Sequence, residues 1–410
     1  MATPTEAVGQ VRSEFQSTPS RLRAEALGTV VQTGVRCSST AASRLAAMNA
    51  IHGWPSNSTE LPHLPALSSR THVRDLTQCL LNTPTGHFLL KARMTTTIRF
   101  YQYGSPEVLK VEDETVGAPG PGQVRLRHEA IGVNFIDTAF REGVMPGRLP
   151  SVPGVEGAGI VEATGPGVEG LERGDRMAYF LTPGSYAQVR LIDAQALLKM
   201  PEDLSSEQVV TVLTKGLTAW AGLNGFHQLK AGEKVLVQGA SSSVGVLLSR
   251  WAKALGATVI GTAGSEAKRM TIAGAIDHAL LSGGADLTSQ VLKIVPGGVD
   301  VVYEFVGRAT FAASAAAVRD GGTIVTIGAA SGPPLIDRAT LTLRQVRVVG
   351  GPMAQYVQGD VARATGDVFD AYRKGTFGAL EVTRYPLAQA ALAHEDIATR
   401  RKSGLIVLVP

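Results

Sequence analysis

The chain has 410 residues, of which 44% are hydrophobic, and this is enough to bury the cores of two or three domains. Its formal net charge is only +4 and its Lys and Arg residues are scattered, which argues against a nucleic-acid partner. No apolar run approaches the roughly 18 residues that a membrane-spanning helix needs. We therefore expect a soluble, cytoplasmic protein with no membrane or nucleic-acid partner.

Residues 1–93 differ in composition from the remainder of the chain. They are rich in Ser, Thr and Arg, and no strand or helix period recurs in them. This composition predicts a poorly ordered N-terminal extension, or sequence upstream of the true start codon. A targeting peptide is the alternative, but Glu6, Glu14 and Glu25 are unusual in a transit peptide, and the apolar core of a secretory signal is missing.

From Met94 to about residue 200, short β-rich segments alternate with Gly- and Pro-rich turns such as APGPG and PGVEG. Several short strands at this spacing predict an all-β or barrel-like unit. The segments read TIRFYQY, QVRLRHEAIGV, AGIVEATG, RMAYF and YAQVRL.

The pattern changes between about residues 232 and 350. There, the near-continuous apolar runs KVLVQ, ATVIGTA, DVVYEFV and TIVTIG alternate with helical stretches. Strands buried on both faces and separated by helices predict a doubly wound parallel sheet with right-handed crossovers. The last part, from about residue 356 to 410, predicts helices over 359–374 and 386–400 and a final strand, LIVLV.

The strand KVLVQ leads into the turn GASSSVG, which predicts a phosphate site. Gly239 can form the sharp exit from the strand, and Gly245 can let the following helix pack close to it. The N-terminus of that helix would present backbone N–H groups and the positive end of its dipole to an anion. Ser242 and Ser243 stand where glycine is usual, and their hydroxyls can donate to a phosphate; a strand–helix turn without a ligand is the alternative. The helix is expected to bury Val244, Leu247, Leu248, Trp251 and Leu255.

The next strand, ATVIGTAG, ends at Gly264 without the Asp or Glu that binds the ribose hydroxyls in many NAD sites. Lys268 and Arg269 follow instead. A missing carboxylate with cations nearby favours the 2′-phosphate of NADP(H). The alternative is that both cations lie on the solvated face of a helix.

From Met94 onward the chain resembles the zinc-free quinone oxidoreductases of the medium-chain dehydrogenase/reductase superfamily, the zeta-crystallin-like group. The resemblance rests on the order and spacing of its motifs. These are YGSPEVLKVE, IGVNFIDT, LPSVPGVEGAGIV, GDRMAY, TKGLTAW, GASSSVG with WAKALGATVIGT, VVYEFVG, IGAASG and AHEDIATR.

This resemblance implies a two-domain α/β fold. A GroES-like, partly open β-barrel catalytic domain would occupy residues 94–217 and be completed by residues 356–410. A Rossmann doubly wound parallel-sheet domain that binds NADP would occupy residues 218–355. The family also suggests a homodimer joined through the edge strand LRQVRVVGG, around residues 340–350.

The zinc ligands of the metal-dependent relatives are missing. Those relatives use a Cys and a Gly-His-Glu triplet, whereas the corresponding stretches here read GVNFIDT and GVEGAG. Asn134 or Phe135 stands in place of the thiol and Val155 in place of the histidine, so we expect no metal cofactor. Glu156 is expected to be a structural carboxylate.

The resemblance implies the site residue by residue. Asn134 would reach cofactor and substrate and orient the acceptor oxygen, although a turn-forming role is the alternative. The pyrophosphate would contact Ser243 and Val244, and the adenosine phosphate Gly264, Ser265 and Lys268, while Arg400 would reach back to the phosphates. Ser242 and Thr218 are also expected to bind the cofactor. The residues expected along the nicotinamide are Phe135, Ile136, Asp137, Val306, Gly328, Ala329, Ala330, Ser331, Pro352, Met353 and Ala354.

Some positions depart from the family pattern. Leu281 lies near the place of a tyrosine that often contacts the 2′-phosphate, which makes the preference for NADPH less secure. Ala139 and Met145 replace two tyrosines of the substrate pocket, so this pocket should be wider and more apolar.

The reaction expected from the resemblance is zinc-independent reduction of quinones by NADPH, through direct hydride transfer in the cleft between the domains. Reduction of an alkene, enone or enoyl-thioester double bond on the same scaffold is the first alternative. Some relatives are structural lens proteins or bind RNA, but the scattered charge of this chain disfavours RNA binding.

Overall fold

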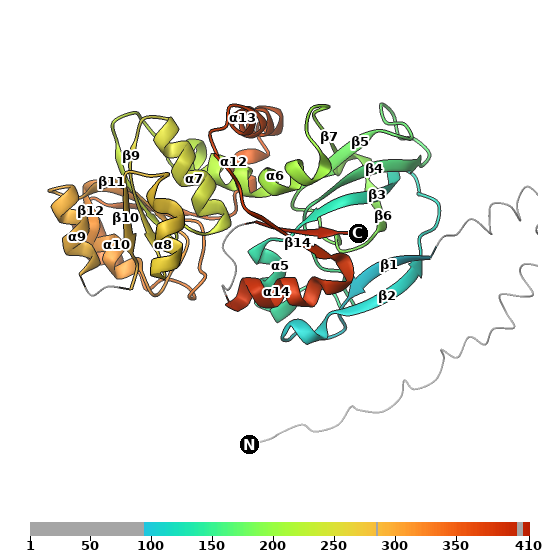
Figure 1. Cartoon of the computed structure of the whole chain (residues 1–410), viewed down its shortest axis with the longest axis horizontal. Helices are drawn as coiled ribbons and strands as arrows, with labels where there is room; N and C mark the ends of the chain where they lie inside the picture. The colour runs from blue at the N-terminus through green and yellow to red at the C-terminus, as the bar shows by residue number, and fades with distance from the viewer. Residues whose placement is uncertain (1–93, 284–285, 400–404) are drawn as a thin grey trace, which may run out of the picture. The chain divides into compact units, whose positions relative to one another are not determined.

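The computed structural model describes residues 94–283, 286–399 and 405–410. The predicted extension, residues 1–93, and Arg400 lie outside this described part. Within it, a parallel sheet and a barrel-like sheet lie on either side of the helix α6 (Ser206–Trp220), as Figure 1 shows. No helix of the described part is long and apolar enough to cross a membrane.

The parallel sheet has the doubly wound order expected of a Rossmann domain. Its order is β10-β9-β8-β11-β12-β13, so the chain runs outward from β8, returns to the centre at β11 and runs outward again. The direction of winding thus reverses between β8 and β11, the place where open parallel sheets bind ligands. The strands are β8 (Lys234–Gln238), β9 (Thr258–Ala263), β10 (His278–Leu281), β11 (Val299–Glu304), β12 (Val318–Thr326) and β13 (Arg347–Gly350), and β13 is an edge strand as predicted.

Helices connect these strands, and the first of them follows the predicted apolar pattern in all but one position. Leu247, Leu248 and Trp251 are buried, but Leu255 is exposed. The reason is its place at the C-terminal cap, where the chain turns away from the sheet at Gly256 with φ 89°. The helices are α7 (Ser243–Ala254), α8 (Glu266–Ala273), α9 (Leu287–Ile294), α10 (Phe311–Ala317) and α11 (Arg338–Leu343).

Strands from both ends of the described chain form the seven-stranded sheet. Its order is β14-β15-β3-β4-β5-β7, and β6 pairs with β3. The C-terminal strand β15 runs antiparallel to β3, so the end of the chain completes the sheet that its beginning starts. The strands are β3 (Gln123–Gly132), β4 (Gly157–Thr164), β5 (Arg176–Tyr179), β6 (Val189–Asp193), β7 (Leu198–Lys199), β14 (Val382–Pro386) and β15 (Leu405–Val409).

A separate two-stranded sheet pairs β1 (Met94–Arg99) with β2 (Lys110–Thr115). The strand β2 was not predicted, because the sequence KVEDET is too polar to read as a buried strand. It forms at the surface instead, where the Arg99 side chain is paired with Glu112 and Glu114 across the two strands.

Further helices and helical turns lie outside the connections of the parallel sheet. The two predicted C-terminal helices are confirmed as α13 (Val361–Arg373) and α14 (Ala390–Thr399). The remaining ones are α5 (Phe135–Glu142) and α12 (Ala354–Val357), the 3₁₀ turns η1 (Pro106–Val108), η2 (Ala194–Ala196) and η4 (Leu387–Gln389), and the π-helical turn η3 (Ala221–Phe226).

The helix α6 joins the two domains into one hydrophobic core. It begins with a capping box, in which the Ser205 hydroxyl accepts from the Gln208 N–H at 3.2 Å and the Gln208 side chain accepts from the Ser205 N–H at 2.8 Å. Both faces of the helix are apolar, and each fully buried Leu or Val contributes about 1.5–3 kcal/mol to folding. Its buried apolar side chains are Val209, Val210, Val212, Leu213, Leu217, Ala219 and Trp220.

Candidate active site

The predicted cofactor-binding turns of the Rossmann domain lie along one edge of the parallel sheet. They follow β8, β9, β11, β12 and β13, and each of these strands pairs in parallel with the next one in the sheet, in the order β9-β8-β11-β12-β13. Because the carboxyl ends of parallel strands meet at one edge, residues far apart in the sequence come together there. The fold therefore gathers these turns around the switch point between β8 and β11.

The turn between β8 and α7 confirms the roles predicted for its two glycines. Gly239 has φ 78°, a left-handed conformation that gives the sharp exit from the strand. A Cβ on Gly245 would lie 2.3 Å from the Gly239 carbonyl oxygen and 2.9 Å from the Cα of Ala240. Only glycine lets the helix come this close to the end of the strand.

Ser242 is the N-cap of α7, and its hydroxyl oxygen accepts from the Gly245 N–H at 3.1 Å. The hydroxyl proton itself is not used in that bond and can be donated to a ligand. The N–H groups of Ser243 and Val244, in the first turn, have no acceptor within the helix. This set of donors, at the positive end of the helix dipole, fits the pyrophosphate of a dinucleotide.

The turn between β9 and α8 begins with a glycine in open space. A Cβ on Gly264 would approach only the Ser282 hydroxyl, at 4.0 Å. Ser265 caps α8, where its hydroxyl accepts from the Lys268 N–H at 3.4 Å. Arg269 is paired through two hydrogen bonds with the Glu266 carboxylate, which agrees with the alternative that this arginine belongs to the solvated face of the helix.

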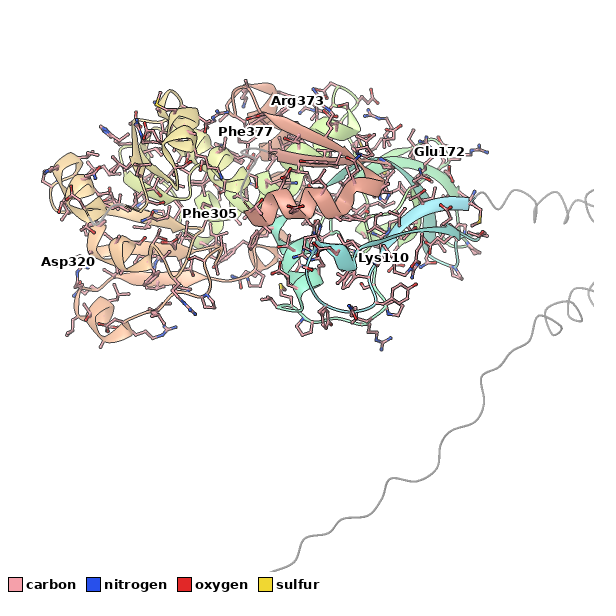
Figure 2. The ribbon with its side chains drawn as sticks, turned by 60° about the horizontal axis from the view of Figure 1, so that its bottom comes forward. Lys110, Glu172, Phe305, Asp320, Arg373 and Phe377 are labelled. Atoms are coloured by element: carbon pink, nitrogen blue, oxygen red, sulfur yellow. The ribbon has the colours of Figure 1, made fainter. Side chains whose placement is uncertain are left out.

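The loops after β11 and β12 are bonded to one another. Ser331 donates both its backbone N–H and its hydroxyl to the Val306 carbonyl, each at 2.7 Å, and its hydroxyl accepts from the Ala309 N–H at 2.9 Å. Gly328 lies directly against Phe305, since a Cβ on this glycine would be 2.6 Å from the Phe305 carbonyl oxygen. Figure 2 labels Phe305 near the middle of the view, at the end of β11. These loops form a fixed surface.

Sequence reasoning missed three buried polar residues beneath these turns. Gln238, Thr262 and Glu304 are fully buried, and Gln238 and Glu304 are the last residues of β8 and β11. The signal that could have found them is a polar residue at the end of an otherwise apolar strand, as in KVLVQ and VVYE. A polar group is retained in such a place only when it has hydrogen-bond partners.

Asn134, the residue predicted to orient the substrate, is the N-cap of α5 and is 8% exposed. Its Nδ2 donates to the Glu156 carboxylate at 3.0 Å and to the Gly132 carbonyl at 3.3 Å. The structure thus gives it the turn-forming position that was the alternative. Both protons of the amide nitrogen are used within the protein, so a bond from this nitrogen to a substrate would replace one of these two.

Glu156 and Lys215 form a fully buried ion pair with an N–O distance of 2.7 Å. The same carboxylate accepts from the Thr214 N–H at 2.8 Å, and the Lys215 ammonium also donates to the Val210 carbonyl at 3.2 Å. Glu156 therefore has the role expected of a structural carboxylate. In the described part of the chain, no group of three or more His, Cys, Asp or Glu residues is placed to hold a metal ion.

Residues of the helix α6 contact both the buried Glu156 of the barrel domain and Met353, which follows β13 of the Rossmann domain. Thr214 and Lys215 bind Glu156, and one turn later Thr218 donates to the Thr214 carbonyl at 2.8 Å and contacts the Met353 sulfur at 3.4 Å. Thr218 and Met353 were both predicted to line the cofactor site, and the structure brings them together. Pro352 is exposed and Ala354 is half-buried on either side of Met353.

Asp137 is fully buried, and burial raises its pKa from 3.8 to about 7. Its carboxylate accepts from the Asn134 N–H at 2.9 Å and from the Tyr186 hydroxyl at 3.0 Å. The same hydroxyl lies 2.9 Å from Nε2 of His394, whose pKa burial lowers to about 3, so this ring is neutral. Phe135 and Asp137 were both predicted to lie at the nicotinamide. The Phe135 side chain is 53% exposed, whereas Asp137 is fully buried.

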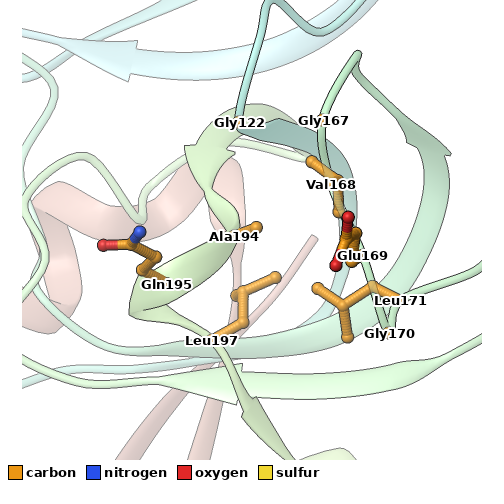
Figure 3. A pocket seen from close by; sticks show the side chains of 9 residues that line it. All are labelled: Gly122, Gly167, Val168, Glu169, Gly170, Leu171, Ala194, Gln195 and Leu197. Atoms are coloured by element: carbon orange, nitrogen blue, oxygen red, sulfur yellow. The ribbon is translucent and has the colours of Figure 1, made fainter.

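The two predicted substrate-pocket residues are neighbours. The Met145 N–H donates to the Ala139 carbonyl at 3.2 Å, and the Met145 side chain is exposed. A separate hollow of about 350 Å³ lies on the barrel domain (Figure 3). It is lined by Gly122, Gly167, Val168, Glu169, Gly170, Leu171, Ala194, Gln195 and Leu197, none of which was predicted for the site.

Comparison with known proteins agrees with this architecture. Residues 120–202 match the family model of the alcohol dehydrogenase GroES-like domain, and residues 243–366 match that of a zinc-binding dehydrogenase. A 2-haloacrylate reductase from a Burkholderia species is 36% identical over 76% of this chain and 97% of its own length. A quinone oxidoreductase from Pseudomonas aeruginosa is 36% identical over 77% of this chain and all of its own length.

A solved structure of Escherichia coli quinone oxidoreductase in complex with NADPH is similar in fold. It is 32% identical, has a TM-score of 0.73, and matches 77% of this chain and all of its own. The matched dehydrogenase family model, over residues 243–366, includes α7 and the turns that follow β9, β11, β12 and β13. The chain belongs to the quinone oxidoreductase family of the medium-chain dehydrogenase/reductase superfamily and is an oxidoreductase.

Proposed function

We propose that the protein reduces quinones with NADPH in a reaction that needs no zinc. The observation that carries this proposal is the first turn of α7, where unused N–H groups and a serine hydroxyl converge beside the switch point of the sheet. A similar protein from Escherichia coli was solved with NADPH, which supports the same coenzyme here. When bound, NADPH supplies the hydride, and the chain holds, orients and shields the reactants.

In this proposal the two domains divide the work. The barrel domain positions the acceptor, and Asn134 would orient its oxygen by exchanging its longer amide bond, the 3.3 Å contact to Gly132. The Rossmann turns bind the coenzyme. Its proposed contacts are Ser242, Ser243 and Val244 at the pyrophosphate, Gly264, Ser265, Lys268 and Arg400 at the other phosphates, and Phe135, Ile136, Asp137, Thr218, Val306, Gly328, Ala329, Ala330, Ser331, Pro352, Met353 and Ala354 toward the nicotinamide.

The buried pair supports independence from zinc. Glu156 already accepts from Lys215, Asn134 and Thr214. A divalent cation at Glu156 would have to approach a buried ammonium group 2.7 Å from that carboxylate, and like charges repel strongly in a buried site. The expected result is full activity after treatment with a chelator, with no stoichiometric zinc in metal analysis of the purified protein. Zinc at one equivalent with loss of activity on chelation would contradict this.

The main test is a titration with NADPH and NADH followed by turnover with a quinone. Lys268→Ala should weaken NADPH more than NADH, because only NADPH carries the 2′-phosphate. Arg269→Ala is the matched control, since the Arg269 side chain is held by Glu266, and it should leave the preference unchanged. A protein that neither binds NADPH nor oxidises it with any quinone would refute the proposal.

The second candidate reaction is reduction of an activated carbon–carbon double bond. The similarity to a 2-haloacrylate reductase favours it, as do the small or flexible side chains of Ala139 and Met145. Comparison of kcat/KM for simple quinones, an enone, an enoyl thioester and 2-chloroacrylate decides between the two. A quinone value at least about tenfold above the others corresponds to about 1.4 kcal/mol of preferential transition-state binding and supports quinone reduction.

The domain boundaries and the dimer are also proposals. The proposed boundary between residues 217 and 218 falls within α6, which belongs to the core of both domains. The exposed edge strand β13 could pair with a second copy, and Leu335 and Leu343 are exposed in the segment that precedes this strand. Light scattering of the wild type and of Val348→Pro in β13 tests this, since only a dimer through the edge strand would dissociate.

A further inference from the structure

We propose that Glu304 is a positioning residue that holds two turns of the coenzyme site in fixed relation through one buried chain of hydrogen bonds. The turns are residues 239–243, after β8, and residues 305–310, after β11. This inference rests on the proposed function for its link to NADPH. The chain of bonds itself is a feature of the protein alone.

The Glu304 carboxylate is the end point of the chain. One of its oxygens accepts from the N–H groups of Val306 and Gly307, at 2.8 and 2.9 Å, and from the Thr310 hydroxyl at 2.8 Å. These donors come from the loop that runs from β11 into α10. The other oxygen accepts from the Ser314 hydroxyl at 2.7 Å. Glu304 thus binds three donors of residues 305–310 through one oxygen, and so it fixes the turn after β11.

The chain continues from Ser314 to the phosphate turn. The Gln238 amide donates to the Ser314 hydroxyl at 3.1 Å and accepts from the Thr262 hydroxyl at 2.7 Å. The Thr262 hydroxyl in turn accepts from the Gly239 N–H at 3.2 Å. Gly239 is the residue that opens the turn before α7. The chain therefore begins in the phosphate turn and ends at Glu304.

All donors in this chain point the same way. Ser314 has one proton and gives it to Glu304, so it must accept from Gln238; Thr262 gives its proton to Gln238 and so accepts from Gly239. Both side-chain oxygens of residue 304 must accept, one from the loop and one from Ser314, and a carboxylate is the side chain with two oxygens that carry no proton. Because all the side chains are fully buried, water cannot replace a lost partner without opening the site.

The position of the chain explains why it would matter for the coenzyme. Gln238 and Glu304 are register partners at the ends of adjacent parallel strands. These strands flank the switch point, so the two residues lie beneath the place where the coenzyme would cross from one half of the sheet to the other. A break in the chain would let the two turns move independently and lower the affinity for NADPH.

The direction of the donors gives a sharp test. In Glu304→Gln the new amide group faces Ser314, which then receives two donors and has no acceptor for its own proton. In Gln238→Glu two carboxylates compete for that proton. The double variant Glu304→Gln/Gln238→Glu reverses the Ser314 bond and satisfies the chain again. We expect about tenfold weaker NADPH binding in each single variant and recovery to within about threefold of the wild type in the double variant.

Hydrogen–deuterium exchange of the coenzyme-free protein supplies a readout other than activity. Each single variant at position 304 or 238 should speed exchange in both turns, and the double variant should slow it again. Thr262→Val keeps the Glu304 bonds and should loosen residues 239–243 alone. Thr310→Val should loosen residues 305–310 alone. These milder variants decide the question if a charged variant does not fold.

Asp300→Asn is the matched control. Asp300 also joins β11 to β8, because it accepts from the Lys234 N–H at 2.7 Å, but it does so at the opposite edge of the sheet. Its loss should leave NADPH binding and exchange in both turns unchanged. Folded single variants with the affinity and exchange of the wild type, or a double variant no better than the singles, would overturn the inference. A wild type that does not bind NADPH refutes the proposed function instead, and the exchange data still decide whether the chain couples the turns.

Discussion

The two sides of the candidate site are held in place by different kinds of interaction. On the barrel side, Glu156, Lys215 and Asp137 are buried groups that can carry charge. On the Rossmann side, backbone N–H groups, hydroxyls and closely packed glycines shape the turns, and the buried Glu304 carboxylate accepts from neutral donors and not from a cation. The difference teaches that the first side should respond to charge and pH, whereas the second should respond to volume and to the direction of hydrogen bonds.

The largest expected effect comes from removing the buried cation. Lys215→Met leaves the Glu156 carboxylate without its counter-charge in a fully buried place. We expect the free energy of unfolding to fall by about 3–5 kcal/mol, measured by urea denaturation. The double variant Glu156→Gln/Lys215→Met should recover much of this loss. A loss below about 1 kcal/mol would mean that the charge on the barrel side is unimportant.

The second effect depends on pH. Burial raises the pKa of Asp137 to about 7, so between about pH 4 and 7 the folded state keeps a proton that the unfolded state has lost. Asp137 therefore lowers stability as the pH rises through this window. The free energy of unfolding of Asp137→Asn should rise relative to that of the wild type by up to about 4 kcal/mol as the pH increases from 4 to 7. Urea denaturation of both proteins at each pH measures this difference.

The stability of the variant must be compared with that of the wild type at each pH, because two buried histidines change stability with pH in the opposite direction to Asp137. Burial lowers the pKa of both His128 and His394 to about 3, so their contribution is complete above about pH 6.5 and is lost as the pH falls. Other groups around Asp137 are Tyr186, Lys215 and Glu156, which are unchanged in the variant. A difference for Asp137→Asn that does not vary with pH would contradict the prediction.

In the turn between β8 and α7, the volume of a side chain should matter more than its charge. Gly245→Ala places a Cβ against the backbone of Gly239 and Ala240, and we expect a loss of about 1–3 kcal/mol in stability that does not vary with pH. Gly366→Ala is the matched control, since this glycine lies in α13 with open space around it. The free energy of unfolding of this variant should rise by about 0.5–1 kcal/mol in the same thermal or urea measurement. Equal effects at the two positions would remove the argument for close packing.

The smallest expected effect comes from Ser242, where two substitutions distinguish its role as the helix cap from its proposed role in binding a phosphate. Ser242→Ala should cost about 1 kcal/mol by loss of the cap, while Ser242→Asp should keep the cap and the stability. Under the proposed function, however, the added negative charge should weaken NADPH binding in a calorimetric titration more than the alanine does. If the aspartate variant binds NADPH as well as the wild type, the first turn of α7 does not bind a phosphate.

Sequence patterns predicted the fold well because the spacing of apolar residues reflects which faces of a strand or helix are buried. The apolar runs became β8, β9, β11 and β12, and the glycines at positions 239 and 245 took the roles that their lack of a side chain suggests. The strand β2 was missed because cross-strand ion pairs, and not burial, hold its polar sequence. Leu255 was misplaced because periodicity does not show where a helix ends.

The candidate site was predicted less completely because hydrogen bonds between distant residues leave little trace in a local pattern. The sequence did not show that Asn134 is bonded to Glu156, because this partner lies 22 residues away in the sequence. The chain from Gly239 to Glu304 joins four separate segments, and only the fold brings them into contact. Buried polar residues at strand ends are the one local sign of such a chain.

The open space around Gly264 has a consequence for evolution. Only the Ser282 hydroxyl, at 4.0 Å, would touch a Cβ at this position, and the backbone there does not have the positive φ that favours glycine. The fold thus places little steric constraint there, although the position follows the strand after which Rossmann folds carry the Asp or Glu that binds the ribose of NAD. Under the proposed function, a lineage could therefore acquire an acidic side chain at Gly264 and change from NADPH to NADH without losing stability.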